Sequence, residues 1–339
     1  MTTKKRERVV LAGDIGGTKT NIGLYVTGKK RPVPLVVESF ASREAAHLEN
    51  IVDRFLERHP AAVSSACFGI AGPVINGRCK ATNLPWVVSE ARLKRHFHWR
   101  HARLLNDLAA TALAIPLLRR SEWVPLNKGI TQKNGNVALL SPGTGLGQAM
   151  LVYKDGKYVP VASEGGHVGF SPTTEQEIDL WRYLRNKFDH VSIERVLSGP
   201  GLVNVYAWLR DSHRYEEPDW LKDLLKREDP AKAISESAFR KKQGLCVESL
   251  RLYVSMLGSA AGNLALTSMA VGGIFLGGGI PPKILPALKQ GAFLKAFTAK
   301  GRFAHLLARI PVRVIVNDKA ALLGAAQAAF ETVEANPSV

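Results

Sequence analysis

The residues Gly13–Gly23, with the sequence GDIGGTKTNIG, decide the fold. They contain the glycines of a phosphate-binding turn, but they match neither G-x-x-x-x-G-K-[ST] nor G-x-G-x-x-G, and no helix pattern follows them. The apolar residues on either side instead predict strands over Val9–Gly13 and Thr20–Val26. The glycine turn therefore joins two strands in a hairpin.

The residues of this turn favour binding of a phosphate and a metal ion. Gly16 and Gly17 permit positive φ and let backbone N–H groups approach an anion closely, and Thr18 and Lys19 add further donors. Asp14 would repel a phosphate, so its place at the mouth of the turn indicates a divalent cation between the two. A plain hairpin with two glycines at its tip stays open as the alternative.

Two further glycine clusters follow. Gly143–Gly147, in PGTGLG, lies between predicted strands over Val137–Ser141 and Gln148–Tyr153, which repeats the strand–turn–strand pattern of the N-terminus. Two such turns, one in each of two lobes, can hold one polyphosphate from opposite sides of a cleft. Gly277–Gly279 follows a strand, and its bare backbone would admit a base and ribose or form an ordinary strand-to-helix turn.

Asn106 and Asp107 stand where a predicted strand, Ala102–Leu105, meets a predicted helix over Asp107–Leu117 that is stopped or kinked near Pro116. Ligand sites collect at the carboxyl ends of strands in α/β sheets. Asn and Asp are also common helix N-caps, but two in a row leave one surplus. Position alone leaves a functional role for Asp107 and a capping role equally open.

The loop SEGGHVGF brings Glu164 and His167 to either side of two glycines. A carboxylate accepts hydrogen bonds and an imidazole can donate or accept, so this pair suits a ligand rich in hydroxyls, with a bland turn as the alternative. Glu194, in SIERVLSGPG, also fits the acidic first turn of a helix.

Composition indicates a soluble globular protein. A length of 339 residues predicts about two domains, and 46% of the residues are hydrophobic. The net charge of +17 allows binding of nucleic acid or an anionic substrate, but the charges form short scattered clusters, which favours a solvated surface. The first residues, MTTKKRERVV, give no signal-peptide pattern.

The cysteines and the longest uncharged segment favour a cytoplasmic location. Cys67, Cys79 and Cys246 have neither metal-ligand nor redox spacing, so we expect reduced thiols. Met256–Pro282 carries no charged residue and is long enough to span a bilayer. Its glycines favour a buried helix over Met256–Ala270 and a buried strand over Gly273–Leu276 instead.

Taken together, these motifs resemble the bacterial glucokinase family, in the branch without a zinc site. The family lies within the superfamily of ATPases that resemble actin, hexokinase and Hsp70. The segments that carry the resemblance, in chain order, are GDIGGTKTN, ATNLPW, NDLAATALAI, PGTGLG, SEGGHVGF, ERVLSGPGLVNVY, GNLAL, GGIFLGGGIPPK and GRF. They cover nearly the whole chain, and the ordered set is far more specific than any one of them.

This resemblance implies ATP-dependent phosphorylation of glucose to glucose 6-phosphate, a reaction that feeds glycolysis, with Asp107 as the general base. It implies Mg²⁺ near Asp14, held largely through water. The expected glucose-binding residues are Asn83, Asn106, Asp107, Glu164, His167 and Glu194. The expected ATP-binding residues are Asp14, Gly16, Gly17, Thr18, Lys19, Gly143, Thr144, Gly145, Gly278 and Gly279.

The implied fold is α/β, a two-lobed actin-like (ribonuclease H-like) ATPase fold with mixed sheets flanked by helices and the active site between the lobes. We expect residues 1–117 and 317–339 to form the small lobe and residues 118–316 the large lobe. The resemblance also favours a cytoplasmic homodimer with no specific nucleic acid or membrane partner.

The sequence departs from the family pattern at Ser163 and at Lys319–Ala320, and two other classes of protein remain as alternatives. Ser163 stands where glycine is frequent, and Lys319–Ala320 stands where Asn-Pro often follows Asn317–Asp318. The related ROK kinases carry a cysteine cluster after the GGH motif, whereas Ser171–Thr174 follows here, so we expect no zinc site. A sugar-sensing DNA-binding regulator would need a domain before Val9, and an assembling or chaperone-like ATPase would not need the sugar-side residues.

Overall fold

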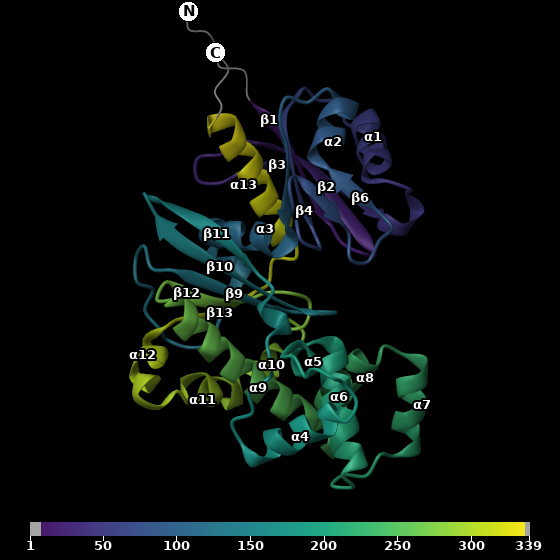
Figure 1. Ribbon diagram of the computed structural model, residues 1–339, viewed down its shortest axis with the longest axis vertical. Coiled ribbons are helices and arrows are strands. Elements are labelled where there is room, and N and C mark those ends of the chain that lie inside the picture. The colour runs from purple at the N-terminus through teal and green to yellow at the C-terminus, as the bar shows by residue number, and fades with distance from the viewer. Residues whose placement is uncertain (1–7, 336–339) are drawn as a thin grey trace, which may run out of the picture. The chain divides into compact units, whose positions relative to one another are not determined.

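The computed structural model of the protein describes residues 8–335 and divides into two compact units (Figure 1). The first unit takes in the residues up to Arg120, Lys157–Ala162 and the residues from Asn317 on, and the second takes in Ser121–Gly156 and Ser163–Val316. The expectation of a chain start without a signal peptide rests in part on Met1–Glu7, which lie outside the described residues.

The sheet of the first unit has the strand order β3-β2-β1-β4-β7. These strands are β1 (Val9–Ile15), β2 (Lys19–Val26), β3 (Val33–Ala41), β4 (Val63–Ile70) and β7 (Ala102–Asn106). Strand β1 pairs antiparallel with β2 and parallel with β4, which pairs parallel with β7. Ile15 pairs with Ile70, and Ile70 pairs with Asn106. The three parallel strands therefore end in one row, and the residues that follow them share one edge of the sheet.

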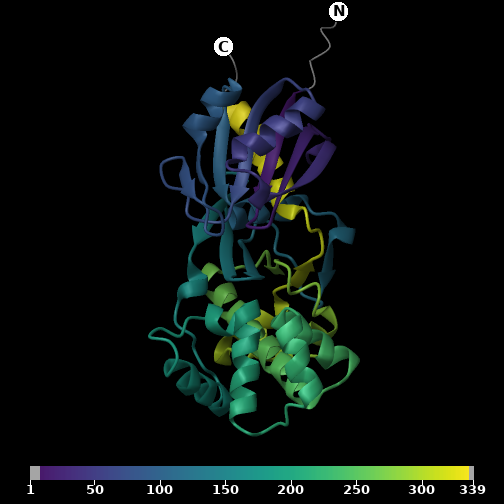
Figure 2. The same cartoon turned by 90° about the vertical axis from the view of Figure 1, so that its right-hand side faces the viewer.

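Helices cover both faces of this sheet. Helices α1 (Leu48–Arg58) and α2 (Glu90–Phe97) lie on one face, and α3 (Asp107–Ala114) and α13 (Ala320–Ala335) lie on the other (Figures 1 and 2). The fully buried ring of Phe55 in α1 belongs to the same apolar core as side chains of β1, β2 and β4. A small antiparallel hairpin, β5 (Arg78–Lys80) and β6 (Val87–Ser89), follows β4 in the chain.

Two helices differ in length from the sequence prediction. The spacing of apolar residues in the sequence predicts a helix over Arg43–Arg58. Helix α1 begins at Leu48 instead, because Ser42–Glu44 forms a separate 3₁₀ turn and His47 and Asn50 cap the helix reciprocally. The helix from Asp107 ends at Ala114 and passes into a 3₁₀ turn over Ile115–Leu117. That confirms the predicted stop near Pro116, which lacks the N–H that a helix needs.

A second sheet has the strand order β11-β10-β9-β12-β13-β8, and all of its strands except β11 lie wholly in the second unit. These strands are β8 (Trp123–Pro125), β9 (Val137–Pro142), β10 (Leu146–Lys154), β11 (Lys157–Ser163), β12 (Gly273–Leu276) and β13 (Val312–Ile315). The pair Asp155–Gly156 is a sequence typical of a two-residue hairpin turn, and the structure confirms this turn: both residues have positive φ, 49° and 81°. Such angles match the twist of a two-residue hairpin.

Helices dominate the rest of the second unit. They are α4 (Glu175–Arg185), α5 (Glu194–Leu197), α6 (Gly199–Asp211), α7 (Asp219–Arg227), α8 (Pro230–Arg240), α9 (Gly244–Ser268), α10 (Leu285–Leu288), α11 (Ala292–Thr298) and α12 (Ala304–Arg309). The buried helix predicted over Met256–Ala270 is the carboxyl-terminal part of α9, and the buried strand predicted over Gly273–Leu276 is β12. None of the helices in residues 8–335 combines the length and apolar character that crossing a bilayer requires.

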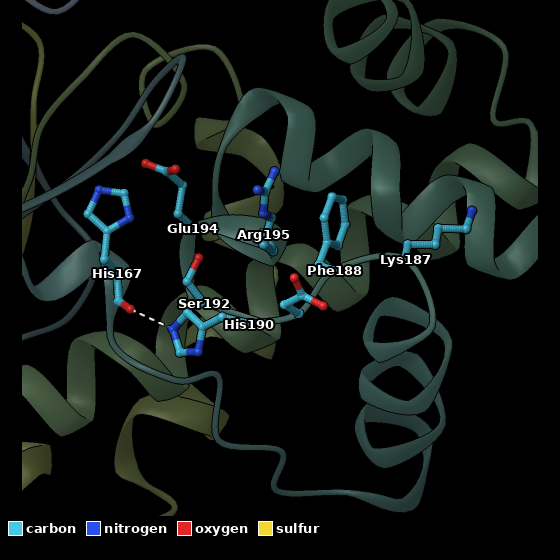
Figure 3. Close-up of a pocket in the computed structure, with 8 residues that line it drawn as sticks. His167, Lys187, Phe188, His190, Ser192, Glu194 and Arg195 are labelled. Atoms are coloured by element: carbon cyan, nitrogen blue, oxygen red, sulfur yellow. Dashed lines mark hydrogen bonds between the residues drawn. The ribbon is translucent and has the colours of Figure 1, made fainter.

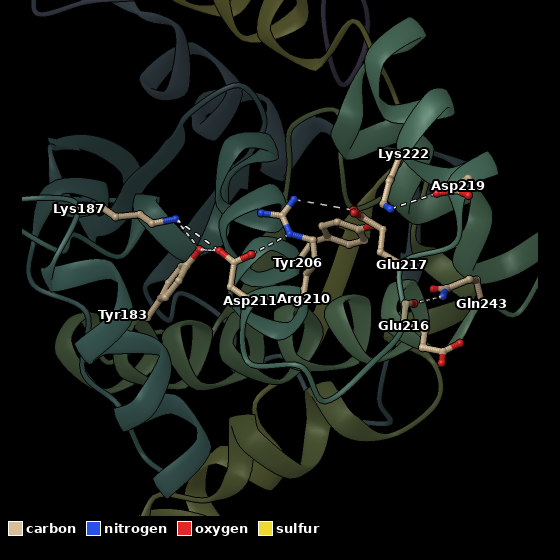
Figure 4. Close-up of polar contacts among 10 residues, drawn as sticks. All are labelled: Tyr183, Lys187, Tyr206, Arg210, Asp211, Glu216, Glu217, Asp219, Lys222 and Gln243. Atoms are coloured by element: carbon tan, nitrogen blue, oxygen red, sulfur yellow. Dashed lines mark hydrogen bonds and ion pairs between the residues drawn. The ribbon is translucent and has the colours of Figure 1, made fainter.

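A polar network joins α4, α6 and the loop before α7 (Figure 4). The Tyr183 hydroxyl donates to a carboxylate oxygen of Asp211 at 2.5 Å, and Arg210 Nε donates to the other oxygen at 2.8 Å. The Tyr206 hydroxyl donates to Glu217 at 2.7 Å. Lys187, which follows α4, donates to the Tyr183 hydroxyl. The network therefore fixes the start of the segment that leads from α4 to α5.

The three cysteines are buried and free, in keeping with the sequence prediction of reduced thiols. Burial raises the pKa of the Cys67 and Cys246 thiols to about 12. At neutral pH such thiols stay protonated and react slowly, because the thiolate is the reactive form.

Helix α13 packs so closely on α3 that Gly324 has no room for a side chain. A Cβ at this position would lie 1.8 Å from the carbonyl oxygen of Ala110 and 3.1 Å from the backbone nitrogen of Ala114. We expect Gly324→Ala to lower the free energy of unfolding by about 1–3 kcal/mol, the usual effect of overpacking a core. Urea unfolding followed by circular dichroism measures it.

Gly244→Ala is the matched control, because Gly244 also lies in a helix and a Cβ there would meet only the Tyr215 ring, at 3.6 Å. This substitution should leave the free energy of unfolding unchanged or raise it by up to about 1 kcal/mol. A Gly324→Ala protein as stable as wild type would contradict the close packing of α3 on α13.

Candidate active site

The turn after β1 is held by its own backbone and by a buried serine. The Gly16 N–H donates to the Lys19 carbonyl at 3.0 Å, which closes the turn. The backbone N–H of Ser42 donates to the Thr18 carbonyl at 2.9 Å, and its hydroxyl donates to the Gly16 carbonyl at 2.8 Å. The Ser42 hydroxyl also lies 2.8 Å from that of Thr20, and both side chains are fully buried. Ser42 therefore clamps both sides of the turn.

Both glycines of this turn are required by close contacts. A Cβ at Gly16 would lie 2.9 Å from the Lys19 carbonyl oxygen, and a Cβ at Gly17 would lie 2.5 Å from Cβ of Asn83. Asn83, exposed on the loop between β5 and β6, thus lies against the tip of the turn. Thr18 and Lys19 are exposed, so their side chains are accessible to a ligand.

Asp14 lies beside the turn in a partly buried polar site. It pairs in the sheet with Asn21, whose side-chain amide donates to the Asp14 carboxylate at 3.4 Å. The Ser39 hydroxyl in turn donates to the Asn21 oxygen at 2.7 Å and orients the amide. Burial raises the pKa of Asp14 to about 6, although the Asn21 hydrogen bond lowers it, and the negative charge of Asp107 raises it further.

The two residues at the start of α3 divide the roles that the sequence left open. Asn106 is the N-cap, since its side-chain oxygen accepts from the backbone N–H of Leu108 at 3.0 Å. Its amide donates to the Gly72 carbonyl at 3.3 Å. Asp107 is the first residue of the helix, and one carboxylate oxygen accepts from the Leu108 N–H at 2.9 Å. Capping is thus supplied by Asn106, and Asp107 occupies the helix end that favours negative charge.

In the second unit, the turn between β9 and β10 is bound at both ends by a single segment. The Gly143 N–H donates to the Gly145 carbonyl at 2.8 Å. The carboxylate of Glu194 accepts from the Leu146 N–H at 2.9 Å, and the Gly199 N–H donates to the Gly143 carbonyl at 2.8 Å. A Cβ at Gly145 would lie 2.6 Å from the Glu194 carboxylate. Glycine at this position is what lets the carboxylate reach the turn.

The other two glycine-rich loops of the second unit pack on the same turn. A Cβ at Gly166 would lie 1.9 Å from the Leu146 carbonyl oxygen, which brings the GGH loop against the start of β10. A Cβ at Gly278, where φ is +78°, would lie 2.5 Å from the Pro142 carbonyl oxygen. Gly279 beside it is exposed, with no atom within 4 Å of a built Cβ. The three glycine-rich motifs of this unit therefore form one cluster.

A cavity of about 440 Å³ opens beside this cluster (Figure 3). His190 Nε2 donates to the backbone carbonyl of His167 at 2.8 Å, which fastens the GGH loop to the segment before α5. Glu164 and His167 are exposed at the two ends of the 3₁₀ turn Gly165–His167. The cavity is lined by His167, Lys187, Phe188, Asp189, His190, Ser192, Glu194 and Arg195.

A carboxylate at a sheet edge and glycine turns that can approach phosphates are parts that phosphoryl transfer can use for positioning and charge stabilisation. The sequence profile of the glucokinase family matches residues 11–332. This chain belongs to the glucokinase family. The glucokinase of Nostoc punctiforme is 39% identical over 333 residues, which cover 94% of this chain and 98% of that protein. The glucokinase of Cronobacter sakazakii is 36% identical over 319 residues, which cover 94% and 96%.

Solved glucokinases share the fold. A glucokinase from an Antarctic psychrotroph matches with a TM-score of 0.85 and 32% identity, over 95% of this chain and 99% of that chain. A glucokinase from Balamuthia mandrillaris, solved in complex with glucose, matches with a TM-score of 0.77 and 20% identity, over 97% and 95%. These likenesses confirm the predicted fold class, an α/β fold of the actin-like ATPase type.

Sequence reasoning missed the residues that support the site from beside it. Ser42 and His190 belong to no motif, and Asn21, although it lies in GDIGGTKTN, was given no role. All three form hydrogen bonds with proposed site residues that only the fold creates. His190 stands four residues before Glu194, near enough to have been considered with it. Nothing in the sequence pairs Ser42 with a turn more than twenty residues earlier.

The pKa of Asp14 gives the protein a specific pH dependence. In the folded state this pKa is about 6, against an ordinary value of 3.8, so between these pH values the native protein holds a proton that the unfolded chain releases. The stability that Asp14 contributes therefore falls as the pH rises through this window. Relative to Asp14→Asn, we expect the wild-type free energy of unfolding to drop by about 2–3 kcal/mol between pH 4 and pH 7.

Urea unfolding of both proteins across this range measures the difference, and the subtraction removes every other titrating group. Asp223→Asn, at an exposed position in α7, serves as the control and should follow wild type at each pH. If the wild-type and Asp14→Asn curves ran parallel, Asp14 would not have the raised pKa.

Proposed function

We propose that this chain transfers the γ-phosphoryl group of ATP to the 6-hydroxyl of glucose, with Asp107 as the general base. The observation that carries this proposal is the division of roles at α3. Asn106 caps the helix, and Asp107 stands beside Asp14 at the sheet edge where the glycine turn begins. Support from related proteins includes a ROK-family glucokinase from Streptomyces griseus, solved with glucose and AMPPNP, with a TM-score of 0.64 and 21% identity over 95% of this chain.

The glycine turns would hold the phosphates of ATP through backbone N–H groups. A turn without side chains lets these donors approach an anion, and the exposed Thr18, Lys19 and Thr144 add a hydroxyl or an ammonium group. Gly278 and Gly279 would admit the adenosine side, because the exposed Gly279 leaves open backbone. The proposed ATP-binding residues are Asp14, Gly16, Gly17, Thr18, Lys19, Gly143, Thr144, Gly145, Gly278 and Gly279.

Asp14 fits a role as the residue that holds Mg²⁺, largely through water. Its carboxylate is partly buried and faces the negative charge of Asp107, and both conditions raise its pKa. A divalent cation would favour the ionised form, since carboxylate oxygens are the ligands that Mg²⁺ prefers. When bound, the ion would offset the charge of the β- and γ-phosphates.

The hydroxyls of glucose would be bound by polar side chains from both units. In the first unit, the exposed Asn83 and the side-chain NH₂ of Asn106 would donate to sugar hydroxyls. The side-chain oxygen of Asn106 already accepts from the Leu108 N–H in the helix cap. In the second unit, Glu164 and Glu194 would accept from hydroxyls and His167 would donate or accept. His167 and Glu194 share the walls of one cavity.

In the transfer step, Asp107 would accept the proton of the 6-hydroxyl while that oxygen attacks the γ-phosphorus. The new P–O bond forms as the bond to the β-phosphate oxygen breaks, so that ADP leaves with the electron pair. A positioned base contributes about 10²–10⁴-fold to such a reaction. The remaining acceleration comes from positioning and charge stabilisation by the two turns.

The oligomeric state, location and partners that we propose are those expected from the family resemblance. We infer a homodimer that acts in the cytoplasm and supplies glucose 6-phosphate to glycolysis. We also infer no specific nucleic-acid partner and no membrane partner, and we assign the high net positive charge to the solvated surface. A sedimentation measurement of the purified chain decides the oligomeric state.

Asp107→Asn tests the general base. Asn has nearly the same shape but lacks the basicity, so we expect kcat for glucose phosphorylation to fall by about 10²–10⁴-fold while the Kd of glucose changes little. A coupled assay for glucose 6-phosphate gives kcat, and isothermal titration gives Kd.

Asp219→Asn is the matched control, because Asp219 is likewise the first residue of a helix but is fully exposed at α7. It should keep wild-type kcat. Near-normal turnover in Asp107→Asn would remove Asp107 from the base role. A wild-type protein that hydrolyses ATP equally well without any sugar would reject the proposed reaction itself.

A further inference from the structure

We propose that Glu194 couples the sugar pocket to the ATP-phosphate turn, so that glucose and ATP bind with positive cooperativity. This inference rests on the proposed function, because it takes the cavity beside Glu194 as the sugar pocket and the turn Gly143–Leu146 as a phosphate turn. It adds a linkage between the two sites and names the residue that carries it.

The Glu194 carboxylate contacts the turn and also lines the cavity. One oxygen of Glu194 accepts from the backbone N–H of Leu146 at 2.9 Å, at the end of the turn. The same side chain lines the cavity of about 440 Å³ together with His167, and Figure 3 shows the Glu194 carboxylate and the His167 ring on the same side of the loop. A carboxylate has two oxygens that can each accept more than one hydrogen bond, so it can hold the turn and a sugar hydroxyl at once.

Residues 194–199 contact both ends of the turn Gly143–Leu146, and we call this segment the strap. It binds the end of the turn through Glu194 and the start of the turn through the Gly199 N–H, which donates to the Gly143 carbonyl at 2.8 Å. Within the strap, the Ser198 hydroxyl donates to the Glu194 carbonyl at 2.8 Å and accepts from the Gly201 N–H at 3.0 Å. Val196, Leu197 and Ser198 are buried. A displacement of Glu194 therefore moves both ends of the turn.

The Glu194 carboxylate lies in close contact with the turn at Gly145. A Cβ at Gly145 would lie 2.6 Å from the Glu194 carboxylate, closer than real Cβ contacts come. A second connection runs on the other side, where the GGH loop packs on the Leu146 carbonyl and His190 holds the His167 carbonyl at 2.8 Å. Glu194 thus contacts the turn directly, and His167 is joined to it through the neighbouring Gly166.

The physical consequence is cooperativity through ordering. In this proposal, water in the cavity restrains the second oxygen of the partly exposed Glu194 carboxylate less than a sugar hydroxyl would. A sugar hydroxyl bound to its second oxygen fixes the carboxylate and, through it, the Leu146 N–H. ATP then binds a turn that is already ordered, so less conformational entropy is lost at that step. Linkage requires ATP to increase the affinity for glucose by the same factor.

Isothermal titration of the full-length chain tests the proposal. AMPPNP with Mg²⁺ is titrated into the protein with and without saturating glucose, and glucose is titrated with and without saturating AMPPNP. We expect each ligand to lower the Kd of the other by the same factor, about 5-fold or more. Independent binding in the wild-type protein would overturn the proposal without any variant.

Three variants locate the coupling. Gly145→Ala keeps the Glu194 carboxylate but pushes it off the turn, so the coupling factor should fall below about 2. Glu194→Ala should weaken glucose binding and also abolish coupling. Glu164→Gln, the matched control, removes the charge of another proposed sugar ligand and should weaken glucose binding while keeping the coupling factor.

The results separate this inference from the proposed function. Retention of the wild-type coupling factor in both Gly145→Ala and Glu194→Ala would overturn the role of Glu194. If wild type phosphorylates glucose but binds the two ligands independently, the inference fails and the proposed function stands. A wild-type protein that neither binds nor phosphorylates glucose would overturn both. Thermal melting of each variant shows whether it is folded before titration.

Discussion

The structure depends on the close approach of glycine backbone to neighbouring atoms at positions where a Cβ would intervene. Gly17 lies against Asn83, Gly166 against the Leu146 carbonyl, and Gly278 against the Pro142 carbonyl. Each contact is possible only because glycine has no side chain. In the second unit these contacts gather three loops, far apart in the chain, around one turn. The polar side chains on those loops are brought together as a result. The absence of side chains at these glycines is therefore a condition for forming the site.

Electrostatics adds a second constraint in the first unit. The row in which β1, β4 and β7 end brings Asp14 and Asp107 near enough for their charges to repel, and the positive charge of Lys19 lowers the pKa of Asp14 by less than Asp107 raises it. Placing two carboxylates in a partly buried site costs stability. A cost of this kind is common where function requires it, since a site that must bind a cation benefits from negative charge.

Much of this could be predicted from the sequence because the information is local. The strand over Val9–Ile15, the hairpin at Gly16 and the break before Pro116 follow from apolar spacing, glycine and proline. The predicted helix start at Arg43 was wrong, and the helix begins at Leu48. The 3₁₀ turn at Ser42–Glu44 places residues i and i+3 on one face, a spacing that an α-helix also shows. The role of Ser42 was invisible, since its partners at Gly16 and Thr18 become neighbours only when β3 returns beside β2.

The contact between Gly145 and Glu194 has a consequence for how this protein can change over generations. A side chain at position 145 would push the Glu194 carboxylate away from the Leu146 N–H, and a shorter residue at position 194 would no longer reach that N–H. A change at either position therefore loses the same hydrogen bond. We expect the two residues to be kept or replaced together among related chains.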